Sequence, residues 1–351
     1  MQHALSLAKK GTQAVSPNPK VGCVIVKRGQ IVGKGYHLEF GGQHAEAIAL
    51  EQAGHKARDS ILYVTLEPCA HWGKTPPCTE QIVDSGVREV IIGMKDPNPI
   101  VNGYEVLKMR GLKARIGILE DECRQINLGY IKYMQAKLPY VTLKAGMTLD
   151  GKIATSSGQS KYITGTEART MVHALRAEKG MVMVGINTVL KDDPLLDARM
   201  TSSNQHPAIL LMDTSLRIPP NAKILKRPDK VIIACAQKAP AKKRKKLEKM
   251  GAKVLSVALK GKEVDLRKAL KAVADLGYVD ILLEGGSQLN ASMIKENLVD
   301  KVMLFTSPKI LGGDALSVVG KLGIKELGNT VTLKDMKVSK VGKDILIEGS
   351  L

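Results

Sequence analysis

The sequence predicts an α/β protein of two domains, and three observations lead to this expectation. The chain has 351 residues, too many for one modest hydrophobic core and suited to two domains of roughly 150 to 200 residues each. Strand-like apolar runs alternate with helical patterns in both halves, which is typical of a mainly parallel central sheet flanked by helices. The pattern restarts after Leu138-Pro139, so we expect domains at residues 1–138 and 139–351.

In the first half, short apolar runs alternate with segments whose apolar residues have the spacing of a helix. We expect, in order, strands at 21–26 and 31–35, a helix at about 44–53, a strand at 61–66, a helix at about 78–84, a strand at 89–94, and one more helix and strand within 107–119. Residues 121–137 have the pattern of a single connecting helix.

The second half repeats this alternation without repeating the sequence of the first. Strands are expected at 140–144, 181–184, 208–213, 230–235, 253–257 and 279–284, with helices between them. Gly285-Gly286 follows the last of these strands and precedes a helical pattern. Such a corner can cradle phosphate, and it is also typical of a plain turn. The basic run 242–246 is expected on a helix, either as a solvated face or as a contact for a polyanion.

Four residues between positions 44 and 78 indicate a catalytic zinc site. His44, Cys69 and Cys78 supply three ligands and leave the fourth tetrahedral position for water, as a catalytic zinc requires. Glu46 lies two residues from His44, so it can reach that water without binding the metal. This set is the one found in zinc-dependent nucleobase deaminases, where the metal lowers the pKa of water and a glutamate carries protons.

Two simpler interpretations of these residues remain open, a structural zinc and a chance coincidence. A closed structural site normally has a fourth Cys or His at ligand spacing. His71 is the candidate, but its loop also contains Trp72, Gly73 and Lys74, which favours contact with substrate.

Composition restricts the class of protein further. The 53 Lys and Arg against 34 Asp and Glu give a formal charge of +19, which favours anionic ligands in general. Aromatic residues make up only 3% of the chain, so platforms for stacking unpaired bases are scarce. Five cysteines, an odd number, indicate a reducing cytoplasmic compartment, with Cys23, Cys123 and Cys235 as buried small hydrophobic residues. The N-terminal segment has no pattern of a leader, no apolar stretch approaches 18 residues, and we expect no association with a membrane.

The spacing between Cys69 and Cys78 distinguishes between families of zinc-dependent deaminases. Ordinary cytidine and tRNA deaminases have Cys-x-x-Cys, whereas eight residues separate Cys69 from Cys78 here. The segment EPCAHWGKTPPC resembles the deaminase half of the bifunctional deaminase/reductases of riboflavin biosynthesis. Further agreement, covering nearly all of residues 1–138, comes from the stretches at 17–22, 37–46 and 94–99.

The resemblance implies a cytidine-deaminase-like, three-layer first domain with one zinc ion on His44, Cys69 and Cys78, and with Glu46 as the proton carrier. It implies a pocket for the pyrimidine and its ribosyl phosphate lined by Asn18, His37, His71, Lys74, Asp96 and Asn98. Asn18 and Asp96 also precede prolines, where turn capping alone would explain them. The family usually continues the last motif as Gly-x-Gly, but Gly103-Tyr104-Glu105 stands here.

The second half resembles the reductase domain of the same enzymes, whose fold is similar to that of dihydrofolate reductase. The matching stretches, which span 139 to about 320, are at 144–154, 157–164, 175–177, 184–188, 192–199, 213–214, 284–286 and 308–313. Departures are Tyr162, where the family usually has Trp, and Gly180, where Asp is common.

The resemblance implies that this domain binds NADPH and a phosphorylated pyrimidine. The cofactor would contact Gly146, Tyr162, Thr188, Asp192, Thr214, Gly285 and Gly286. The substrate would contact Lys144, Ser160, Arg176, Leu196, Arg199 and Glu284. Arg176 and Arg199 suit a phosphate group as forks, and Lys144 is expected to be catalytic by polarising the reacting centre. Asp192-Asp193-Pro194 would also fit a plain turn, and Thr188 would also fit a helix cap.

These expectations combine into one function, the deamination and then the NADPH-dependent reduction of a riboflavin precursor by a cytoplasmic enzyme. Its partner is a small phosphorylated pyrimidine rather than nucleic acid, and the resemblance implies a homo-oligomer. Two alternatives remain open at this point: an RNA deaminase whose second half binds nucleic acid, motivated by the +19 charge, and a deaminase whose second half is inactive and only structural.

Overall fold

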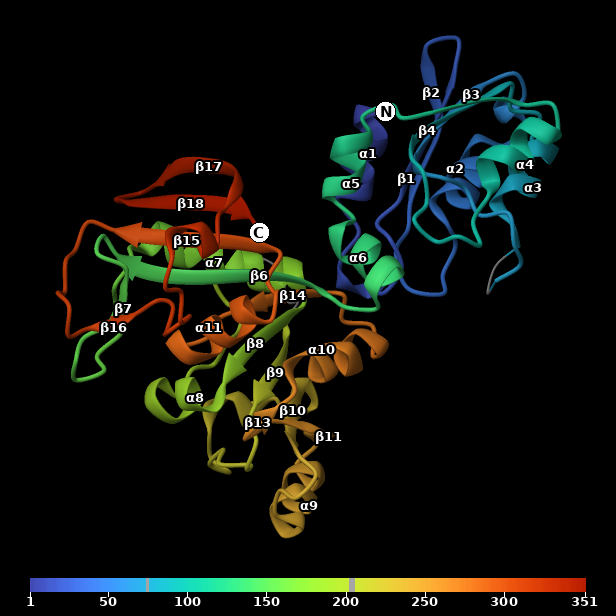
Figure 1. The fold of residues 1–351 in the computed structure, drawn as a ribbon. Helices are drawn as coiled ribbons and strands as arrows, with labels where there is room; N and C mark the ends of the chain where they lie inside the picture. The colour runs from blue at the N-terminus through green and yellow to red at the C-terminus, as the bar shows by residue number, and fades with distance from the viewer. Residues whose placement is uncertain (74–75, 202–205) are drawn as a thin grey trace. The chain divides into compact units, whose positions relative to one another are not determined.

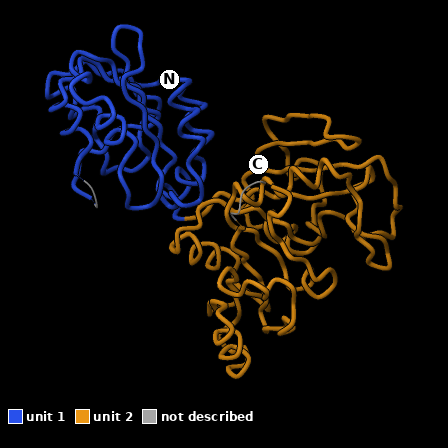
Figure 2. The backbone as a smooth tube through the Cα atoms, turned by 180° about the vertical axis from the view of Figure 1, so that it is seen from behind, with its two compact units in different colours: residues 1–137 blue, residues 138–351 orange. Residues whose placement is uncertain are grey.

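The computed structural model of the chain describes residues 1–73, 76–201 and 206–351. The chain divides into two compact units, Met1–Lys137 and Leu138–Leu351 (Figure 2). Within the described ranges no helix is long and apolar enough to cross a membrane.

The first unit is built on a five-stranded sheet in the order β2-β1-β3-β4-β5. The strands are β1 (Gly22–Lys27), β2 (Gln30–Tyr36), β3 (Ile61–Leu66), β4 (Glu89–Met94) and β5 (Lys113–Ile116). The helices are α1 (Gln2–Ala8), α2 (Ala45–Ala53), α3 (Cys78–Asp84), α4 (Gly103–Met109), α5 (Glu120–Gln125) and α6 (Leu128–Ala136), with short 3-10 turns at Gln13–Val15 and Gly54–Ala57. The expected bounds 61–66, 78–84 and 89–94 are confirmed.

Helices cover both faces of this sheet, which gives the expected three layers (Figure 1). The layers follow from alternation along the strands, because successive side chains of a strand point to opposite faces. Cys23 and Ile25 of β1 pack in one cluster with Ala49 of α2 and Ile82 of α3, whereas Val24 packs with α1 on the other face. The core is therefore continuous with both helical layers.

Two expectations for this unit are wrong. The sheet is mixed rather than mainly parallel, because β1 pairs antiparallel with both β2 and β3, while β3, β4 and β5 are parallel. Two residues connect β1 to β2, and so short a connection permits only an antiparallel hairpin.

The single connecting helix expected at 121–137 is two helices, α5 and α6. The break contains Asn127, whose side-chain amide accepts from the backbone N of Lys20 at 2.8 Å and donates to the carbonyl oxygen of Lys20 at 3.1 Å. Because Asn competes with helical hydrogen bonds when it finds backbone partners elsewhere, this contact stabilises the interruption.

The second unit contains a nine-stranded sheet in the order β11-β10-β9-β8-β14-β6-β15-β18-β17. Its strands are β6 (Tyr140–Thr148), β8 (Met181–Gly185), β9 (Ala208–Met212), β10 (Val231–Ala236), β11 (Lys253–Val257), β14 (Asp280–Leu283), β15 (Lys301–Ser307), β17 (Lys334–Val341) and β18 (Asp344–Ser350). All neighbours from β11 to β15 are parallel, and β15, β18 and β17 are antiparallel. Two small sheets pair β12 (Leu259–Lys260) with β13 (Glu263–Val264) and β7 (Lys152–Ala154) with β16 (Leu316–Ser317).

In the part of this unit that the structure describes, five helices flank the large sheet, namely α7 (Thr166–Lys179), α8 (Ile186–Asp192), α9 (Ala241–Lys249), α10 (Leu266–Asp275) and α11 (Ser287–Lys295), with 3-10 turns at Lys223–Lys226, Pro228–Lys230 and Leu327–Asn329. Helices α7, α8 and α9 contribute to one hydrophobic cluster, and α10 and α11 to the other. The sheet is therefore covered on both faces, as expected. Strand β6 runs four residues beyond its expected end at Lys144, because Lys144 to Thr148 pair with β15, a strand absent from the predicted elements.

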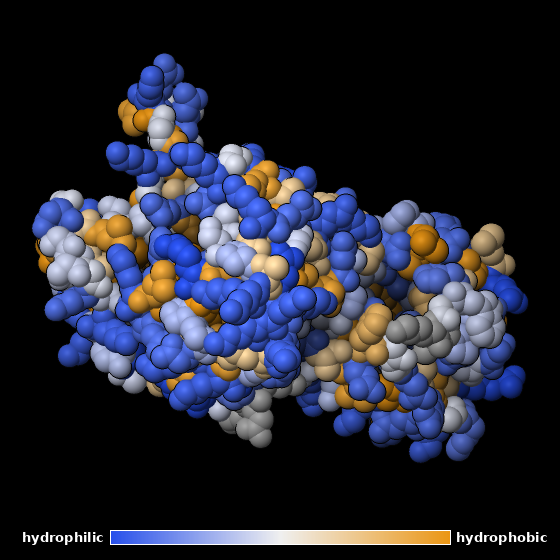
Figure 3. Space-filling view, turned by 90° about the horizontal axis from the view of Figure 1, so that it is seen from below, coloured by the Kyte–Doolittle hydropathy of each residue, from blue (hydrophilic) through white to orange (hydrophobic). Residues whose placement is uncertain are grey.

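The surface of the protein is mainly hydrophilic. Hydrophilic side chains cover most of the face shown in Figure 3, and apolar residues form small separate patches. The basic run 242–246 lies on α9, where Leu247 is the buried residue. Cys23, Cys123 and Cys235 are buried free thiols, as expected.

Candidate active sites

Three elements of the first unit bring the predicted zinc ligands together. His44 is the N-cap of α2, Cys78 is the first residue of α3, and Cys69 lies in the loop after β3. Nδ1 of His44 lies 3.2 Å from Sγ of Cys78 and 3.5 Å from Sγ of Cys69. Among the described residues these three form the group that could hold a metal ion, with all ligand atoms within 4.8 Å of one another.

The spacing of these ligands and the ionisation of Cys69 fit zinc. Bond lengths of about 2.0–2.1 Å to nitrogen and about 2.3 Å to sulfur, at a tetrahedral angle, separate N and S by roughly 3.5 Å. Hydrogen bonds from Cys78, and also from His44, lower the pKa of the Cys69 thiol, and zinc binds the thiolate form. The geometry therefore suits one ion held by one imidazole and two sulfurs.

Glu46 lies in the first turn of α2 and is only 4% exposed. Burial raises the pKa of its carboxyl to about 6, a value near the working pH, at which a carboxyl group can both accept and release a proton. Glu46 lines a cavity of about 270 Å³ together with His44 and Cys69. It is not among the three residues that could hold a metal ion in the described part of the chain.

The same cavity collects most of the predicted pyrimidine-binding residues, which are Asn18, His37, His71, Asp96 and Asn98. Lys74 lies outside the described residues. The amide nitrogen of Asn18 lies 3.1 Å from Nε2 of His37, and Nδ1 of His37 lies 3.0 Å from the carbonyl oxygen of Gln43. Burial lowers the pKa of His37, so its ring is held neutral. His71 lines the cavity and is not in the metal group of the described residues.

Glu67 fixes the loops around the cavity. Its two carboxylate oxygens accept from the backbone N of Asp96 at 3.1 Å and of Tyr104 at 2.9 Å. Gly103 stands beside this contact, and a Cβ atom there would lie 1.9 Å from the carbonyl oxygen of Pro68. Gly103 is therefore required where the Cys69 loop meets α4. The departure from the family pattern lies two residues later, at Glu105.

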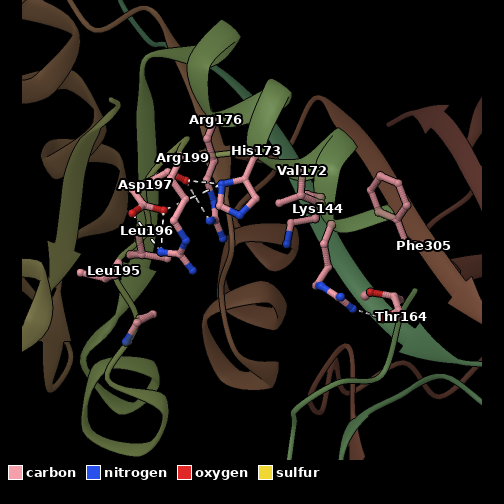
Figure 4. Close-up of a pocket in the computed structure, with 13 residues that line it drawn as sticks. Lys144, Thr164, Val172, His173, Arg176, Leu195, Leu196, Asp197, Arg199 and Phe305 are labelled. Atoms are coloured by element: carbon pink, nitrogen blue, oxygen red, sulfur yellow. Dashed lines mark hydrogen bonds and ion pairs between the residues drawn. The ribbon is translucent and has the colours of Figure 1, made fainter. Parts of the chain in front are cut away.

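A second cavity, of about 240 Å³, lies in the second unit and brings together Lys144, Gly146, Arg176, Leu196 and Arg199 (Figure 4). Glu284 joins two of these residues. It accepts from Nζ of Lys144 at 2.8 Å, and from Nε and Nη2 of Arg176 at 2.6 and 2.9 Å. Burial opposes its ionisation, but Arg176 and Lys144 outweigh burial and hold the pKa of Glu284 well below its usual range.

Arg176 and Arg199 differ in how many of their guanidinium N–H donors are available to a ligand. The fork of Arg176 is engaged with Glu284, and its Nη1 donates to the carbonyl oxygen of Asp197 at 3.1 Å, so the expected use of that fork for phosphate does not agree with its contacts. Arg199 is bound to the Asp197 carboxylate through Nη1 alone, and its other nitrogens have no partner among the described residues. Arg199 therefore keeps donors for an anionic group.

The predicted cofactor residues lie mainly at the carboxyl ends of parallel strands, where ligands of open α/β sheets bind. Thr188 and Asp192 belong to α8, which follows β8, and Gly285-Gly286 joins β14 to α11. Oγ of Ser160 donates to Asp192 at 3.0 Å. Thr214 follows β9, but its hydroxyl donates to Glu263 at 2.5 Å. Tyr162 is 67% exposed, and the Arg169 guanidinium lies 4.6 Å from its ring centre.

A further cavity, of about 510 Å³, adjoins the start of α11 and is lined by Ser287, Lys191, Lys321 and Gly158, among others. At Gly286 a Cβ would approach no atom closer than 3.8 Å, whereas at Gly285 it would lie 2.4 Å from Oδ1 of Asn290. Gly285 is thus explained by packing, and Gly286 leaves the helix N-terminus open.

Sequence reasoning missed several cavity residues. Arg169 and His173 line the second cavity, and they stand seven and three residues before Arg176 on α7. Helical spacing places all three on one face, so this signal was available. Tyr130 and Met134 of α6 line the first cavity, but nothing in their sequence neighbourhood indicates it.

Comparisons with known proteins agree with the class of domain expected for each unit. The family model for the cytidine and deoxycytidylate deaminase zinc-binding region matches residues 1–94, and the model for the RibD C-terminal domain matches residues 139–347. The riboflavin biosynthesis protein RibD of Aquifex aeolicus is 42% identical over 349 residues, 99% of this chain and 96% of that protein. RibD of Escherichia coli strain K12 is 34% identical over 361 residues, 99% of this chain and 97% of that protein.

Solved structures give the same result. Acinetobacter baumannii RibD, form 1, superposes with a TM-score of 0.90 at 36% identity, covering 100% of this chain and 97% of that chain. A Thermotoga maritima protein described as a diaminohydroxyphosphoribosylaminopyrimidine deaminase/5-amino-6-(5-phosphoribosylamino)uracil reductase superposes with a TM-score of 0.87 at 35% identity, with 100% and 97% coverage.

Proposed function

The chain belongs to the RibD family, the bifunctional deaminase/reductases of riboflavin biosynthesis, and from this premise we propose its substrates, its second cofactor and the residues that act. The first unit deaminates 2,5-diamino-6-(5-phosphoribosylamino)pyrimidin-4(3H)-one, and the second reduces 5-amino-6-(5-phosphoribosylamino)uracil to the ribitylamino product. Support comes from the name of the Thermotoga maritima relative, which covers the whole chain. The two alternatives left open by the sequence, a nucleic-acid-binding or an inactive second half, disagree with the RibD C-terminal domain match.

In the first unit, we assign the zinc ion to His44, Cys69 and Cys78. A zinc ion held there would lower the pKa of a water molecule enough for nucleophilic attack at neutral pH. Glu46 would take up the proton that the attacking water loses, on a carboxylate oxygen, and deliver it to the amine that departs as ammonia. Its burial and its pKa of about 6 support this role.

The polar side chains of the same cavity hold the substrate. Asn18 and the neutral His37 form a fixed pair at 3.1 Å, and Asp96 and Asn98 face the cavity from the loop after β4. Amide and carboxylate groups can bind the donors and acceptors of a pyrimidine ring. His71 contributes a buried Nδ1 that has no partner among the described residues. Lys74 completes the proposed set as a ligand for phosphate.

In the second unit, Lys144 is the proposed catalytic residue. Its ammonium group is held at 2.8 Å by Glu284, which stays ionised because Arg176 also binds it. Lys144 can therefore donate a hydrogen bond to a ribose oxygen of the substrate while the ribosyl carbon is reduced. Arg199 binds the substrate phosphate with the donors that Asp197 leaves free, and Ser160 and Leu196 complete the substrate contacts.

NADPH is the proposed hydride donor, since the cofactor carries the hydride chemistry in such reductases. Thr188, Asp192 and Gly286 lie where β8 and β14 end, and the N-terminus of α11 favours negative charge such as a pyrophosphate. Lys191 and Lys321 at the cavity beside it add positive charge. Gly146 and Tyr162 are proposed for the nicotinamide end. The hydroxyl of Thr214 already donates its hydrogen to Glu263, so Thr214 has no side-chain donor left for the cofactor.

The observation that carries the proposal is the joint presence of the zinc-ligand triad with Glu46 and of the Lys144-Glu284-Arg176 network in one chain. The test is to supply the pure enzyme with the diamino pyrimidine nucleotide, and separately with the deaminated nucleotide and NADPH. Ammonia release in the first assay and NADPH oxidation in the second are expected. Release of ammonia from tRNA but not from the free nucleotide would overturn the proposal.

Three broader assignments remain proposals as well. We propose that the enzyme self-associates, that it binds no nucleic acid and that it acts in the cytoplasm. Exposed apolar side chains on the β17–β18 edge support self-association, among them Met336, Val338 and Ile345, which are 59%, 64% and 43% exposed. Light scattering on the purified protein is expected to give a mass above that of one chain, and a monomer would contradict this assignment.

A further inference from the structure

Tyr130 makes a direct contact with one of the proposed substrate ligands. Its hydroxyl donates to Oδ1 of Asp96 at 2.8 Å, although the two residues are 34 positions apart in the chain. Tyr130 is 7% exposed and lines the same cavity as Asp96, Asn98 and Glu46. Neither Tyr130 nor Asp96 falls within residues 1–94, the part matched by the deaminase family model.

The two oxygens of Asp96 are used differently. Oδ1 accepts from Tyr130 and also from the backbone N of Asn98 at 2.8 Å. Within the described part of the chain, Oδ2 receives no hydrogen bond. A carboxylate with one oxygen doubly engaged has a fixed orientation, and its other oxygen is available to an N–H donor of a ligand in the cavity.

The charge on Asp96 depends on these contacts. Burial raises the pKa of Asp96 to about 6, while the Asn98 amide, the Tyr130 hydroxyl and His71 lower it and Glu67 raises it. These are the charged and polar groups that face Asp96 from α6, from the loop after β3 and from its own loop. A hydrogen bond to the ionised form favours that form, so loss of the Tyr130 hydroxyl would leave Asp96 protonated up to a higher pH.

We propose that Tyr130 is a positioning residue of the deaminase site, which acts through Asp96 by orienting its carboxylate and keeping it ionised to accept an N–H group of the pyrimidine. This inference rests on the proposed function, because it requires that Asp96 bind the substrate of the first unit. The Asn98 contact is a local turn and would be present without Tyr130. The hydroxyl of Tyr130 is therefore the part of the arrangement that the turn does not explain.

The test compares Tyr130→Phe with wild type in ammonia release from the diamino pyrimidine nucleotide, with kcat and KM measured separately from pH 5.5 to 9. A lost hydrogen bond to a charged group is expected to lower kcat/KM about tenfold at neutral pH, mainly through KM. The acid limb of the profile shifts to higher pH, so the ratio of wild type to variant decreases as the pH is raised. Zinc content and NADPH oxidation by the second unit remain as in wild type.

Tyr133→Phe is the matched control, because Tyr133 lies on the same helix, is only partly buried and does not line the cavity. It loses one hydroxyl group and is expected to keep the wild-type profile. A Tyr130→Phe defect that is equal at every pH, or that is accompanied by loss of zinc, would mean a general structural role and would overturn the inference.

A double-mutant cycle gives a second readout. In an Asp96→Asn background the carboxylate is absent, so adding Tyr130→Phe is expected to change kcat/KM less than twofold. A tenfold effect in that background would show that Tyr130 acts on something other than Asp96. Failure of the proposed function can be distinguished from failure of this inference. If the proposed function is wrong, wild-type enzyme releases no ammonia from the nucleotide. If wild type is active and Tyr130→Phe has an unchanged profile, only the inference about Tyr130 is overturned.

Discussion

Two buried glutamates, one in each unit, have opposite electrostatic surroundings. Burial raises the pKa of Glu46 to about 6, because the residues around it compensate its charge only in part. The side chain of Glu284 is 9% exposed, but Arg176 and Lys144 bind its two oxygens and hold its pKa well below the usual range. A carboxyl group of the first kind can exchange protons, whereas one of the second kind is a fixed anion. Under the proposed function, the same residue type thus serves proton transfer in one unit and positioning of a lysine in the other.

Replacement of Glu46 by Gln tests the first role. Gln keeps the size of the side chain but cannot carry the proton, so ammonia release is expected to fall by about 10²- to 10⁴-fold. Zinc content is expected to stay at one ion per chain, and NADPH oxidation with the deaminated nucleotide to stay at the wild-type rate. Metal analysis beside the two assays checks this, and an unchanged rate of ammonia release would exclude Glu46 as the proton carrier.

The low pKa of Glu284 predicts how the second unit responds to acid. Its pKa in the folded chain lies below the unfolded value of about 4.3, so the unfolded state binds more protons and this group stabilises the fold above that pH. The contribution is lost as the pH falls toward the lower folded pKa. Calorimetry at pH 7 and across pH 5 to 2.5 should show a smaller acid-induced loss of unfolding free energy in Glu284→Gln than in wild type.

The same substitution has a cost at neutral pH. Glu284→Gln leaves Arg176 and Lys144 buried without their counterion, which is expected to destabilise the second unit by about 3 to 5 kcal/mol. Equal stability of the variant and wild type at pH 7 would contradict the assignment of Glu284 as the central anion of this network.

At the scale of elements, the zinc site depends on how the loop after β3 meets α4. Cys69 lies in a loop and is tied to α3 by two hydrogen bonds, whereas His44 and Cys78 stand at helix N-termini. The carbonyl oxygen of Cys69 accepts from the backbone N of Thr79 at 3.1 Å, and its Sγ accepts from the backbone N of Cys78 at 3.4 Å. Gly103, the first residue of α4, packs against that loop at the carbonyl oxygen of Pro68. Glu67 adds hydrogen bonds to the backbone of Asp96 and Tyr104. The position of one proposed zinc ligand therefore depends on an element more than thirty residues away.

A Gly103→Ala substitution tests this dependence. The added Cβ would lie 1.9 Å from the carbonyl oxygen of Pro68, a contact that only a shift of the loop or of α4 can relieve. Overpacking of this kind typically costs about 1 to 3 kcal/mol, so the variant is expected to bind zinc more weakly and to release ammonia more slowly. Competition for zinc with a chromogenic chelator measures the first effect. NADPH oxidation serves as the internal control, and a wild-type zinc affinity would refute the role given to Gly103.

At the scale of the whole molecule, each unit has its own sheet, its own hydrophobic clusters and its own cavity. The residues of the zinc site all precede Lys137, and the Lys144 network lies entirely after it. The requirements of the two reactions are therefore separate, even though one chain performs both.

Removal of the metal tests this separation. Dialysis against a zinc chelator is expected to abolish ammonia release and to leave NADPH oxidation with the deaminated nucleotide at the wild-type rate. Added Zn²⁺ should restore the first activity, and the reference is enzyme dialysed without chelator. Parallel loss of both activities would mean that the second unit depends on the metal, in conflict with the separate cavities.

The sequence by itself determined most of the elements and indicated the candidate zinc ligands. Strands β3 and β4 and helix α3 have the expected bounds, because apolar periodicity and helix start signals are local properties of the chain. The same holds for His44, Glu46, Cys69 and Cys78, whose types and order specify the chemistry. The family resemblance added the cavity residues Asn18, His37, Asp96 and Asn98, which the structure gathers around one space.

The tertiary structure decided what depends on partners distant in sequence. The break between α5 and α6 involves Asn127 bound to the backbone of Lys20, and the fork of Arg176 faces Glu284, 108 positions away. Tyr130 enters the deaminase cavity only because α6 packs beside the loop that holds Asp96. Residue type and spacing show what a side chain can do, but its actual hydrogen-bond partner is fixed only when the sheet and its helices have brought remote segments together, since the free energy of such a contact is absent from either segment alone.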